Sequence, residues 1–243
     1  MTKKITVLQA LKQSGIFKDE KEINETIKKN KVTLDGEIIT KLNFQFNPRR
    51  RKLLADGKET FTQEKYYFIL NKQKGYSCQK NEKFPFVVDL IKVDNNVKNS
   101  LFSVGRLDVP TTGLLIITND GKFARKILAP ESKVPKTYEV VLEEEISNES
   151  IKKLESGILL RIKGKNYKTL PAKLKQINSK KVEITICEGK KRQVREMFKE
   201  IGNKVLELKR IKIGNLSLAE LKLGEGEYKQ ISNSSIIFNI ENK

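Results

Sequence analysis

The chain has 243 residues, which is enough for one large domain or two modest ones with a hydrophobic core. Its 49 Lys and Arg against 30 Asp and Glu leave a net charge of +19, which favours a polyanionic partner such as RNA, DNA or an acidic membrane surface. Histidine is absent, and this excludes Ser-His-Asp triads, Cys-His dyads and His-ligated metal sites.

The excess positive charge is not confined to one tail. Residues 1–65 hold 15 Lys and Arg against 9 Asp and Glu, and the remaining residues hold 34 against 21. A partner that contacts both halves of the chain would explain this spread. A general lysine bias of the source proteome is the alternative explanation.

Cysteine use and hydropathy indicate the compartment. The two cysteines, Cys78 and Cys187, stand outside any Cys-x-x-Cys pattern, so we expect no zinc cluster and a reducing environment. No run of 18 apolar residues is present, and the first residues lack the apolar core of a signal peptide. These features predict a cytoplasmic protein with no metal and no membrane partner.

The N-terminal part reads as a small α/β unit. Apolar residues at positions 7, 8 and 11 share a helical face, and Gly15 can end that helix. A second helix is predicted over residues 18–29. Residues 31–39 then read as a hairpin around the turn Asp35-Gly36.

Two short helices and this hairpin resemble the small S-four-like RNA-binding domain. The resemblance rests on residues 31–40, Lys-Val-Thr-Leu-Asp-Gly-Glu-Ile-Ile-Thr, and on the later Ala-Asp-Gly-Lys. It predicts an RNA-binding domain over residues 1–60, followed by a polar linker over 61–65. The predicted RNA-binding residues of this domain are Lys28, Lys31, Arg49, Arg50 and Arg51. A solvated basic face on a helical hairpin is the alternative.

A second domain is predicted over residues 66–243. It begins with the apolar run at 66–70, typical of a buried strand. Further strands are predicted at 137–142, 172–177, 181–187 and 205–213, and helices at 122–128, 151–156 and 192–201. The fold class is therefore α+β, with a small N-terminal α/β domain and a larger domain whose mixed, mainly antiparallel sheet is flanked by helices.

One segment of the second domain carries most of the chemical information. Residues 105–113 read Gly-Arg-Leu-Asp-Val-Pro-Thr-Thr-Gly, and an apolar strand and an Asn-Asp-Gly turn follow. The segment places one carboxylate, Asp108, just before the start of a strand. We expect the strand to fix the backbone there and the turn to expose the side chain. Taken alone, an aspartate in a turn more often bonds the local backbone.

The longer phrase Gly-Arg-Leu-Asp-x-x-Thr-x-Gly-Leu-Leu, followed by Thr-Asn-Asp-Gly, resembles the active-site motif of the Rsu-type pseudouridine synthases, which modify small- and large-subunit rRNA. The resemblance implies that Asp108 is the essential catalytic residue in the isomerisation of a uridine. It acts either as nucleophile on the ribose or as a base or stabiliser during glycosidic cleavage. No atoms are gained or lost, so no cofactor is expected. A large-subunit target is our expectation.

Two further motifs resemble the same family. Lys-Thr-Tyr-Glu-Val at 136–140 implies that Tyr138 packs against the target base, with proton transfer as a second possible role. Residues 188–198 resemble the Gly-basic-x-Arg-Gln-hydrophobic-Arg motif, which implies that Arg195 pairs with the catalytic Asp. Lys190, Lys191 and Arg192 would then hold phosphates, and Arg192 and Arg195 could exchange roles. A core tyrosine and a solvated basic loop are the alternatives.

Arg106 precedes the catalytic Asp by two residues. The resemblance suggests that its guanidinium fills the gap left by a flipped nucleotide or grips the phosphate of that nucleotide. A structural salt bridge is the alternative. The opening of the domain, Asn-Lys-Gln-Lys-Gly at 71–75, resembles the family's Asn-Lys-Pro-x-Gly, with Gln73 where proline is usual.

These features predict an rRNA pseudouridine synthase that acts as a monomer on ribosomal RNA or a pre-ribosomal particle. The alternative is a non-catalytic RNA-binding or ribosome-assembly factor on the same scaffold. The sequence contains no helix-turn-helix or zinc module typical of a DNA-binding regulator, so no DNA partner is expected.

Overall fold

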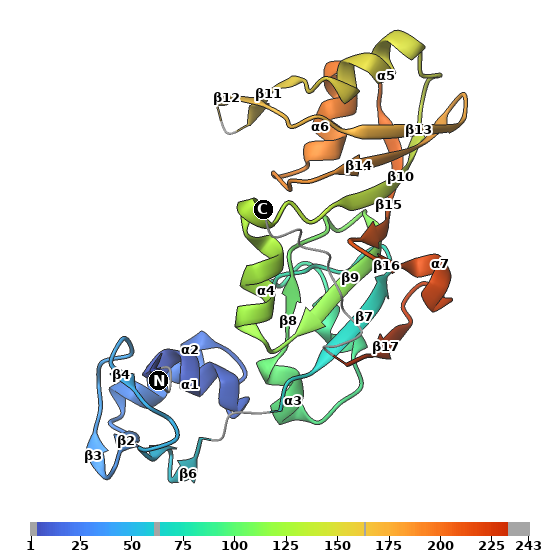
Figure 1. The fold of residues 1–243 in the computed structure, drawn as a ribbon. Helices are drawn as coiled ribbons and strands as arrows, with labels where there is room; N and C mark the ends of the chain where they lie inside the picture. The colour runs from blue at the N-terminus through green and yellow to red at the C-terminus, as the bar shows by residue number, and fades with distance from the viewer. Residues whose placement is uncertain (1–3, 61–63, 163, 233–243) are drawn as a thin grey trace. The chain divides into compact units, whose positions relative to one another are not determined.

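A computed structural model describes residues 4–60, 64–162 and 164–232 of the chain, which divides into two compact units. Unit 1 comprises residues 1–66 and 91–102, and unit 2 comprises residues 67–90 and 103–243 (Figure 1). Positions 61–63 of the predicted linker lie outside the described residues.

Unit 1 is an α/β unit with short elements. Helix α1 ends at Gly15, whose φ of 69° is the left-handed conformation that glycine adopts without strain. The Thr6 side chain caps the start of α1 and the Asp19 side chain caps the start of α2, as their residue types favour. The predicted helices and the hairpin around Asp35-Gly36 are confirmed. The elements are β1 (Ile5–Thr6), α1 (Val7–Ser14), α2 (Glu20–Lys28), β2 (Val32–Leu34), β3 (Glu37–Ile38), β4 (Gln45–Phe46), β5 (Leu53–Ala55), β6 (Lys58–Glu59) and α3 (Asn95–Ser100).

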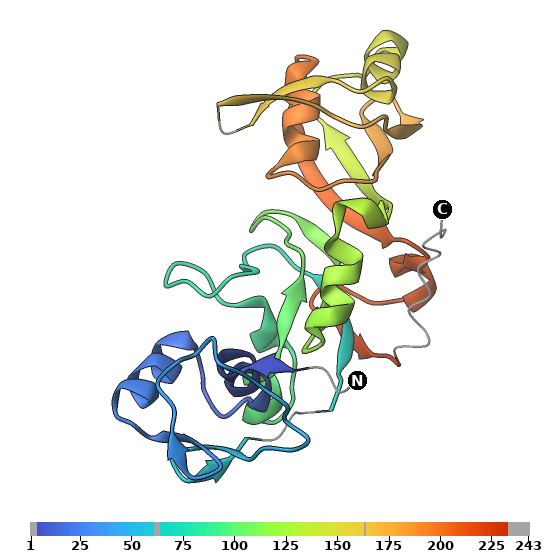
Figure 2. The ribbon, with the colours of Figure 1, turned by 60° about the vertical axis from the view of Figure 1, so that its left-hand side comes forward.

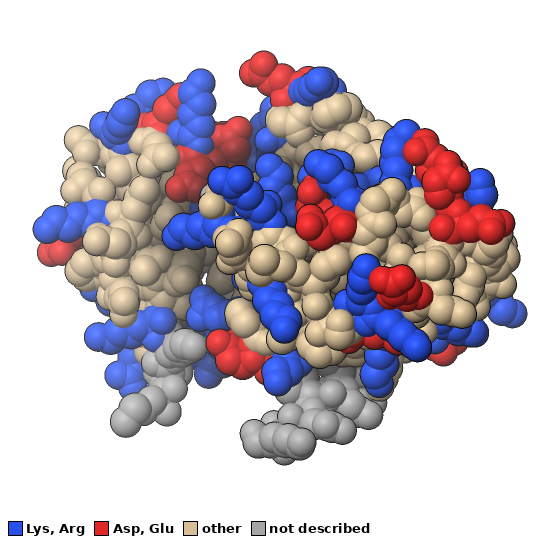
Figure 3. Space-filling view, turned by 90° about the horizontal axis from the view of Figure 1, so that it is seen from above, with Lys and Arg blue, Asp and Glu red and all other residues tan. Residues whose placement is uncertain are grey.

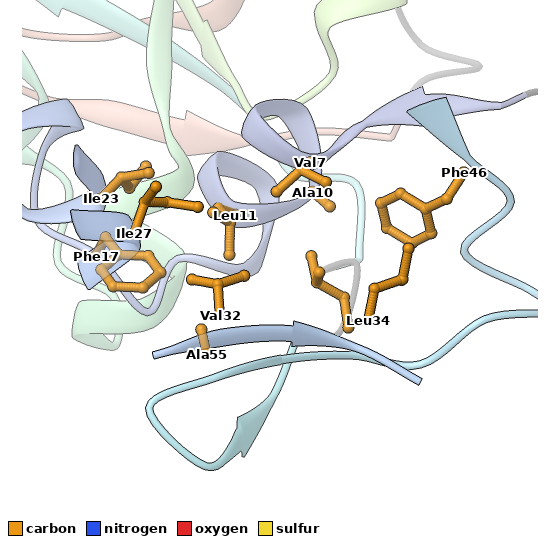
Figure 4. Close-up of a cluster of buried hydrophobic side chains, with 11 residues drawn as sticks. Val7, Ala10, Leu11, Phe17, Ile23, Ile27, Val32, Leu34, Phe46 and Ala55 are labelled. Carbon is orange, nitrogen blue, oxygen red and sulfur yellow. The ribbon is translucent and has the colours of Figure 1, made fainter. Parts of the chain in front are cut away.

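The core of unit 1 lies between its first two helices and its strands. The sheet has the order β3-β2-β5-β6, and all its pairs are antiparallel. Figure 4 shows the apolar side chains of α1 and α2 facing those of β2 and β5. The buried cluster is Val7, Ala10, Leu11, Phe17, Ile23, Ile27, Val32, Leu34, Phe46, Leu53 and Ala55.

Residues 91–102 cluster with unit 1, although the sequence pattern assigned them to the second domain. The Asn99 side-chain amide donates a hydrogen bond to the Gly15 carbonyl at 3.1 Å. A Cβ atom at Gly15 would stand 1.7 Å from the Asn96 carbonyl oxygen, so α1 approaches α3 more closely than any other residue would allow. Unit 1 is therefore built from two separate stretches of the sequence, which a single boundary near residue 65 does not describe.

Unit 2 contains the larger sheet. Its order is β13-β14-β10-β15-β9-β7-β17, with β16 paired to β15 and β8 paired to β9. The pair β15–β9 is parallel, and the other pairs along the main path are antiparallel, so the predicted mixed, mainly antiparallel sheet is confirmed. The strands are β7 (Tyr67–Lys72), β8 (Phe102–Val104), β9 (Thr112–Thr118), β10 (Lys136–Leu142), β11 (Leu159–Ile162), β12 (Lys165–Lys168), β13 (Lys173–Asn178), β14 (Lys181–Ile186), β15 (Val205–Ile213), β16 (Leu216–Ser217) and β17 (Tyr228–Gln230).

Helices pack against the sheet of unit 2. The Phe123 ring of α4 meets the Tyr67 ring of β7 edge-on, with centroids 5.1 Å apart. Asp120 caps the start of α4, and Ser147 caps the start of α5. The helices are α4 (Gly121–Leu128), α5 (Asn148–Glu155), α6 (Gln193–Glu200) and α7 (Leu218–Leu221), with 3-10 turns η1 (Val87–Leu90) and η2 (Pro130–Ser132).

The hairpin β11–β12 was not predicted from the sequence. Four antiparallel pairs join its strands, from Leu159 with Lys168 to Ile162 with Lys165. Figures 1 and 2 both show it beside α6, reaching away from the main sheet. No helix within the described residues is long and apolar enough to cross a membrane.

The parallel pair β9–β15 depends on one glycine. Gly113 has a φ of 106°, and a Cβ atom there would stand 2.2 Å from the Arg210 carbonyl oxygen. We expect Gly113→Ala to lower the free energy of unfolding by about 2–5 kcal/mol, because it adds backbone strain and overpacking at the centre of the sheet. Urea unfolding followed by circular dichroism measures the change.

Gly121→Ala is the matched control. Gly121 begins α4, has no positive φ, and its added Cβ atom would meet no other atom within 4 Å. Alanine there should leave the urea midpoint unchanged or raise it slightly, because alanine has the higher helix propensity. Equal midpoints for the two variants would show that the close approach of β9 to β15 tolerates a side chain.

Candidate active site

Asp108 lies in the loop between β8 and β9. The Thr111 N–H donates to the Asp108 carbonyl at 2.9 Å, so the loop closes in a tight turn just before β9 begins. The Asp108 carboxylate is half-buried. Within the described residues it has no hydrogen bond and no ion pair, so it does not serve the backbone of its own turn. This leaves the carboxylate available for a ligand.

Lys72, at the end of β7, forms hydrogen bonds to this loop. The side chain is fully buried, and its ammonium group donates to the carbonyls of Thr111 at 2.8 Å, Val109 at 3.2 Å and Asp108 at 3.3 Å, and of Gln73 at 3.1 Å. Burial lowers the pKa of Lys72, while the nearby Cys78 and Asp108 oppose that shift. The loop that carries Asp108 is therefore tied to the central sheet at three of its carbonyls.

Asp108 faces a cavity of about 210 Å³ that lies wholly within unit 2. Its walls come from the Asp108 loop, from β10, from β14 and the loop that follows it, from the start of α6 and from β15. Three separate motifs of the sequence therefore meet at one place. The lining residues are Gly105, Arg106, Leu107, Asp108, Thr111, Tyr138, Ile186, Gly189, Lys190, Lys191, Arg192, Gln193, Val194 and Leu208.

Tyr138 forms part of the cavity wall. It lies on β10 between Ile184 of β14 and Arg210 of β15, and only 8% of its surface is exposed. Ile186, Val194 and Leu208 add apolar surface to the same cavity. A flat ring with apolar neighbours suits a planar, partly polar guest such as a nucleobase.

Basic side chains also line the cavity. Lys190, Lys191 and Arg192 are all exposed and line it. Arg192 has a φ of 54°, a conformation that non-glycine residues adopt infrequently, and its guanidinium lies 3.9 Å from the Glu196 carboxylate. These three side chains make part of the cavity wall positively charged.

Arg195 is not part of the cavity lining. Its guanidinium donates to the Val205 carbonyl at 2.8 Å, and its Nε is buried with no partner among the described residues. Burial lowers the pKa of Arg195, repulsion from Arg192 lowers it further, and attraction to Asp108 opposes both. Asp108 is thus within electrostatic range, but neither Arg195 nor Arg192 forms an ion pair with it in the described structure. The pairing that the resemblance implied stays a prediction.

Arg106 lines the cavity and is exposed. One terminal nitrogen donates to the Gln79 side-chain oxygen at 3.1 Å. It has no ion pair within the described residues, so the structural salt bridge considered as its alternative role is not what holds it.

The basic residues of unit 1 form a separate group. Lys31 pairs with Asp56 at 2.7 Å, and Arg51 pairs with Asp35 at 2.5 Å. Lys28, Arg49 and Arg50 are exposed. Part of the predicted RNA-binding set therefore stabilises the turns of unit 1, and part projects into solvent.

Glu188 was missed as a functional residue. Its carboxylate accepts hydrogen bonds from the Tyr167 hydroxyl and the Gln193 amide, and from the Leu170 N–H at 3.0 Å. The Lys190 ammonium lies 4.6 Å from the centre of the Tyr167 ring. Glu188 thus joins the β11–β12 hairpin to the loop that lines the cavity. Its signal in the sequence is its place at the start of the third motif.

The contacts of the Tyr167 hydroxyl predict that it ionises at a higher pH than a free tyrosine. Burial, and then the bond to Glu188, raise the pKa of Tyr167 to about 12. Because the folded-state pKa lies above the unfolded value of about 10, the linked stability is full below pH 10 and is lost as the pH rises through 12. Phenolate absorbance should show Tyr67 and Tyr167 both ionising near pH 12, and Tyr167→Phe should remove one of the two phenolates from that step. Glu188→Gln should move the Tyr167 ionisation to lower pH, and an unchanged curve would contradict the role of Glu188.

Comparison with known proteins identifies the class of enzyme. The family model described as RNA pseudouridylate synthase matches residues 66–200, which include Asp108, Tyr138 and Arg195. A crystal structure of a pseudouridylate synthase superposes with a TM-score of 0.69 at 33% identity, covering 96% of this chain and 98% of that one. The fold is that of a pseudouridine synthase.

Curated relatives match over most of their length. The chain is 35% identical over 231 residues to an uncharacterized RNA pseudouridine synthase of Bacillus subtilis, YtzG, covering 93% of this chain and 94% of that protein. It is 36% identical to ribosomal small subunit pseudouridine synthase A of Haemophilus influenzae, covering 88% and 91%, and of Escherichia coli, covering 86% and 89%. The chain belongs to the RNA pseudouridylate synthase family, and the protein is an enzyme of that class.

Proposed function

We propose that this protein converts one uridine of small-subunit ribosomal RNA to pseudouridine. The observation that carries the proposal is the single carboxylate of Asp108 at a cavity that also presents Tyr138, apolar side chains and three cations. A flipped uridine fits each part of this cavity. Its ribose would face the Asp108 carboxylate, its flat base would pack on the Tyr138 ring, and its phosphates would meet the basic side chains.

The reaction needs only groups that this chain has. The bond between N1 of uracil and the ribose anomeric carbon breaks, the base rotates, and a bond forms from C5 to the same carbon. The proton on C5 is lost and one is gained at N1, so atoms balance without an oxidant or a cofactor. Asp108 either attacks the anomeric carbon or acts as the base, and Tyr138 holds the base against the apolar wall.

The proposed target subunit differs from the one expected from the sequence. The curated relatives with 36% identity are named as small-subunit enzymes, so they do not support a large-subunit target. We therefore propose the small-subunit RNA.

The experiment that tests this function uses wild-type protein and undermodified rRNA of both subunits. Pseudouridine is mapped at nucleotide resolution after incubation. New pseudouridine at one position of the small-subunit RNA is the expected result. A site in the large-subunit RNA alone would overturn the target. No pseudouridine in either RNA would overturn the enzymatic function and leave a binding factor.

We further propose that unit 1 is an S-four-like domain that adds RNA affinity. Figure 3 shows Lys and Arg side chains, with Asp and Glu among them, over one face of the chain. Arg49 and Arg50 are exposed and, unlike Arg51, have no ion pair in the described structure. Arg49→Ala with Arg50→Ala should weaken RNA binding about tenfold and reduce the salt slope by about two, because two phosphate contacts are lost. Turnover at saturating RNA should not change, and a loss of turnover alone would contradict this role.

A further inference from the structure

The loop after β7 has a defined shape. The Ser77 N–H donates to the Pro85 carbonyl at 2.9 Å, which closes the base of the loop. At its tip the Asn81 side-chain oxygen accepts from the N–H groups of Lys83 at 3.0 Å and Phe84 at 2.9 Å, and its amide donates to the Gln79 carbonyl at 2.8 Å. Gln79 therefore occupies a fixed position on the loop.

This loop contacts the two residues that directly precede Asp108 in the chain. The Leu107 N–H donates to the Cys78 sulfur at 3.3 Å, and the Arg106 guanidinium donates to the Gln79 side-chain oxygen at 3.1 Å. The Ser103 hydroxyl also donates to the Cys78 carbonyl at 3.4 Å. Adjacent residues of one loop thus hold adjacent residues of the catalytic loop, one through its backbone and the other through its side chain.

We propose that Gln79 is a positioning residue that holds Arg106 at the rim of the cavity and releases it when RNA binds. The inference rests on the proposed function, because release is needed only if a nucleotide enters. Gln79 and Arg106 are both exposed, so their hydrogen bond exchanges with water at little cost. An RNA phosphate is a stronger partner for a guanidinium than a neutral amide, because the hydrogen bond is then charge-assisted.

The Gln79 side chain is uncharged, and this is why it can release Arg106. A carboxylate at the same position would compete with the RNA phosphate for the Arg106 guanidinium. A neutral amide binds the guanidinium more weakly, so the phosphate can displace it. The same amide still restricts Arg106 in the free enzyme, so the side chain starts from one position when a nucleotide enters. Gln79 would therefore act on RNA engagement through Arg106, without contacting the reacting atoms.

The test compares Gln79→Glu and Gln79→Ala with wild type on the RNA that wild type modifies. Gln79→Glu should lower kcat/KM by about threefold to tenfold, because the new ion pair opposes release. The defect relative to wild type should shrink as salt rises, because salt screens an exposed pair. Gln79→Ala should lower kcat/KM by about twofold to threefold at every salt concentration, because Arg106 is then no longer restricted in the free enzyme. Gln176→Glu on β13, also exposed, adds the same charge elsewhere in unit 2 and should change little.

A double-mutant cycle with Arg106→Ala decides whether the effect passes through Arg106. In that background Gln79→Glu should cause no further loss, since its partner is gone. An equal loss with and without Arg106 would overturn the proposal and make Gln79 a direct RNA contact. Wild-type activity for Gln79→Glu would also overturn it. Absence of pseudouridine with wild-type protein would instead reject the proposed function, so the two failures are distinct.

Discussion

Replacement of Asp108 by asparagine is expected to abolish isomerisation while the protein stays folded and binds RNA. Asparagine has nearly the same shape but is neither a nucleophile nor a base, so we expect kcat to fall by at least about 1,000-fold, or about 4 kcal/mol of activation free energy. The carboxylate has no hydrogen bond or ion pair within the described structure, so the free energy of unfolding should change by less than about 0.5 kcal/mol. RNA affinity should hold or rise, because a negative charge near the phosphates is removed.

Single-turnover kinetics, RNA binding and urea unfolding measure these three quantities separately. Asp89→Asn is the matched control, because Asp89 is an exposed residue of η1 in the same unit. It should leave all three measurements close to wild type. An Asp108→Asn enzyme as active as wild type would remove Asp108 from the chemistry. A large loss of stability would mean that the carboxylate supports the fold.

The short elements could be predicted because their signals are local. Gly15 ends α1, and Asp35-Gly36 forms the turn of the first hairpin, as the sequence indicated. Each of these signals involves residues only a few positions apart. The same holds for β10, whose burial alternates along the strand.

Long-range pairing could not be predicted in the same way. A buried strand pattern at residues 112–118 does not say which strand lies beside it, and the parallel partner β15 comes much later in the chain. Residues 91–102 gave no sign that they would pack with α1, because the contact depends on the missing side chain of Gly15. In both cases the deciding interaction is tertiary.

The candidate site was predicted in part. The resemblance named Asp108, Tyr138 and Arg192, and the structure brings all three to one cavity. It also implied that Arg195 pairs with Asp108, whereas here Arg195 bonds the Val205 carbonyl. The role of Lys72 was missed, because lysine is almost never fully buried and its carbonyl partners lie on another loop.

Lys72→Met is expected to damage both the fold and the chemistry. Methionine matches the length of the lysine stem but donates nothing to the four carbonyls. The Asp108 and Val109 carbonyls keep bonds from the N–H groups of Thr111 and Gly75, but the Thr111 and Gln73 carbonyls lose the donor recorded for them. Leaving buried acceptors unpaired should lower the free energy of unfolding by about 2–4 kcal/mol.

The same change should lower kcat about 100-fold, because a shift of about 1 Å in the loop moves Asp108 away from the reacting carbon. Lys74→Met is the matched control: it removes the same charge two residues later, and its pair with Glu207 is 3.6 Å long and exposed. Such a pair contributes at most about 1 kcal/mol, so this variant should stay stable and active. Since both variants lose one positive charge, a difference between them reports the carbonyl contacts and not the attraction of RNA. Equal stability and equal kcat would mean that the β7 strand supports the Asp108 loop without the ammonium group.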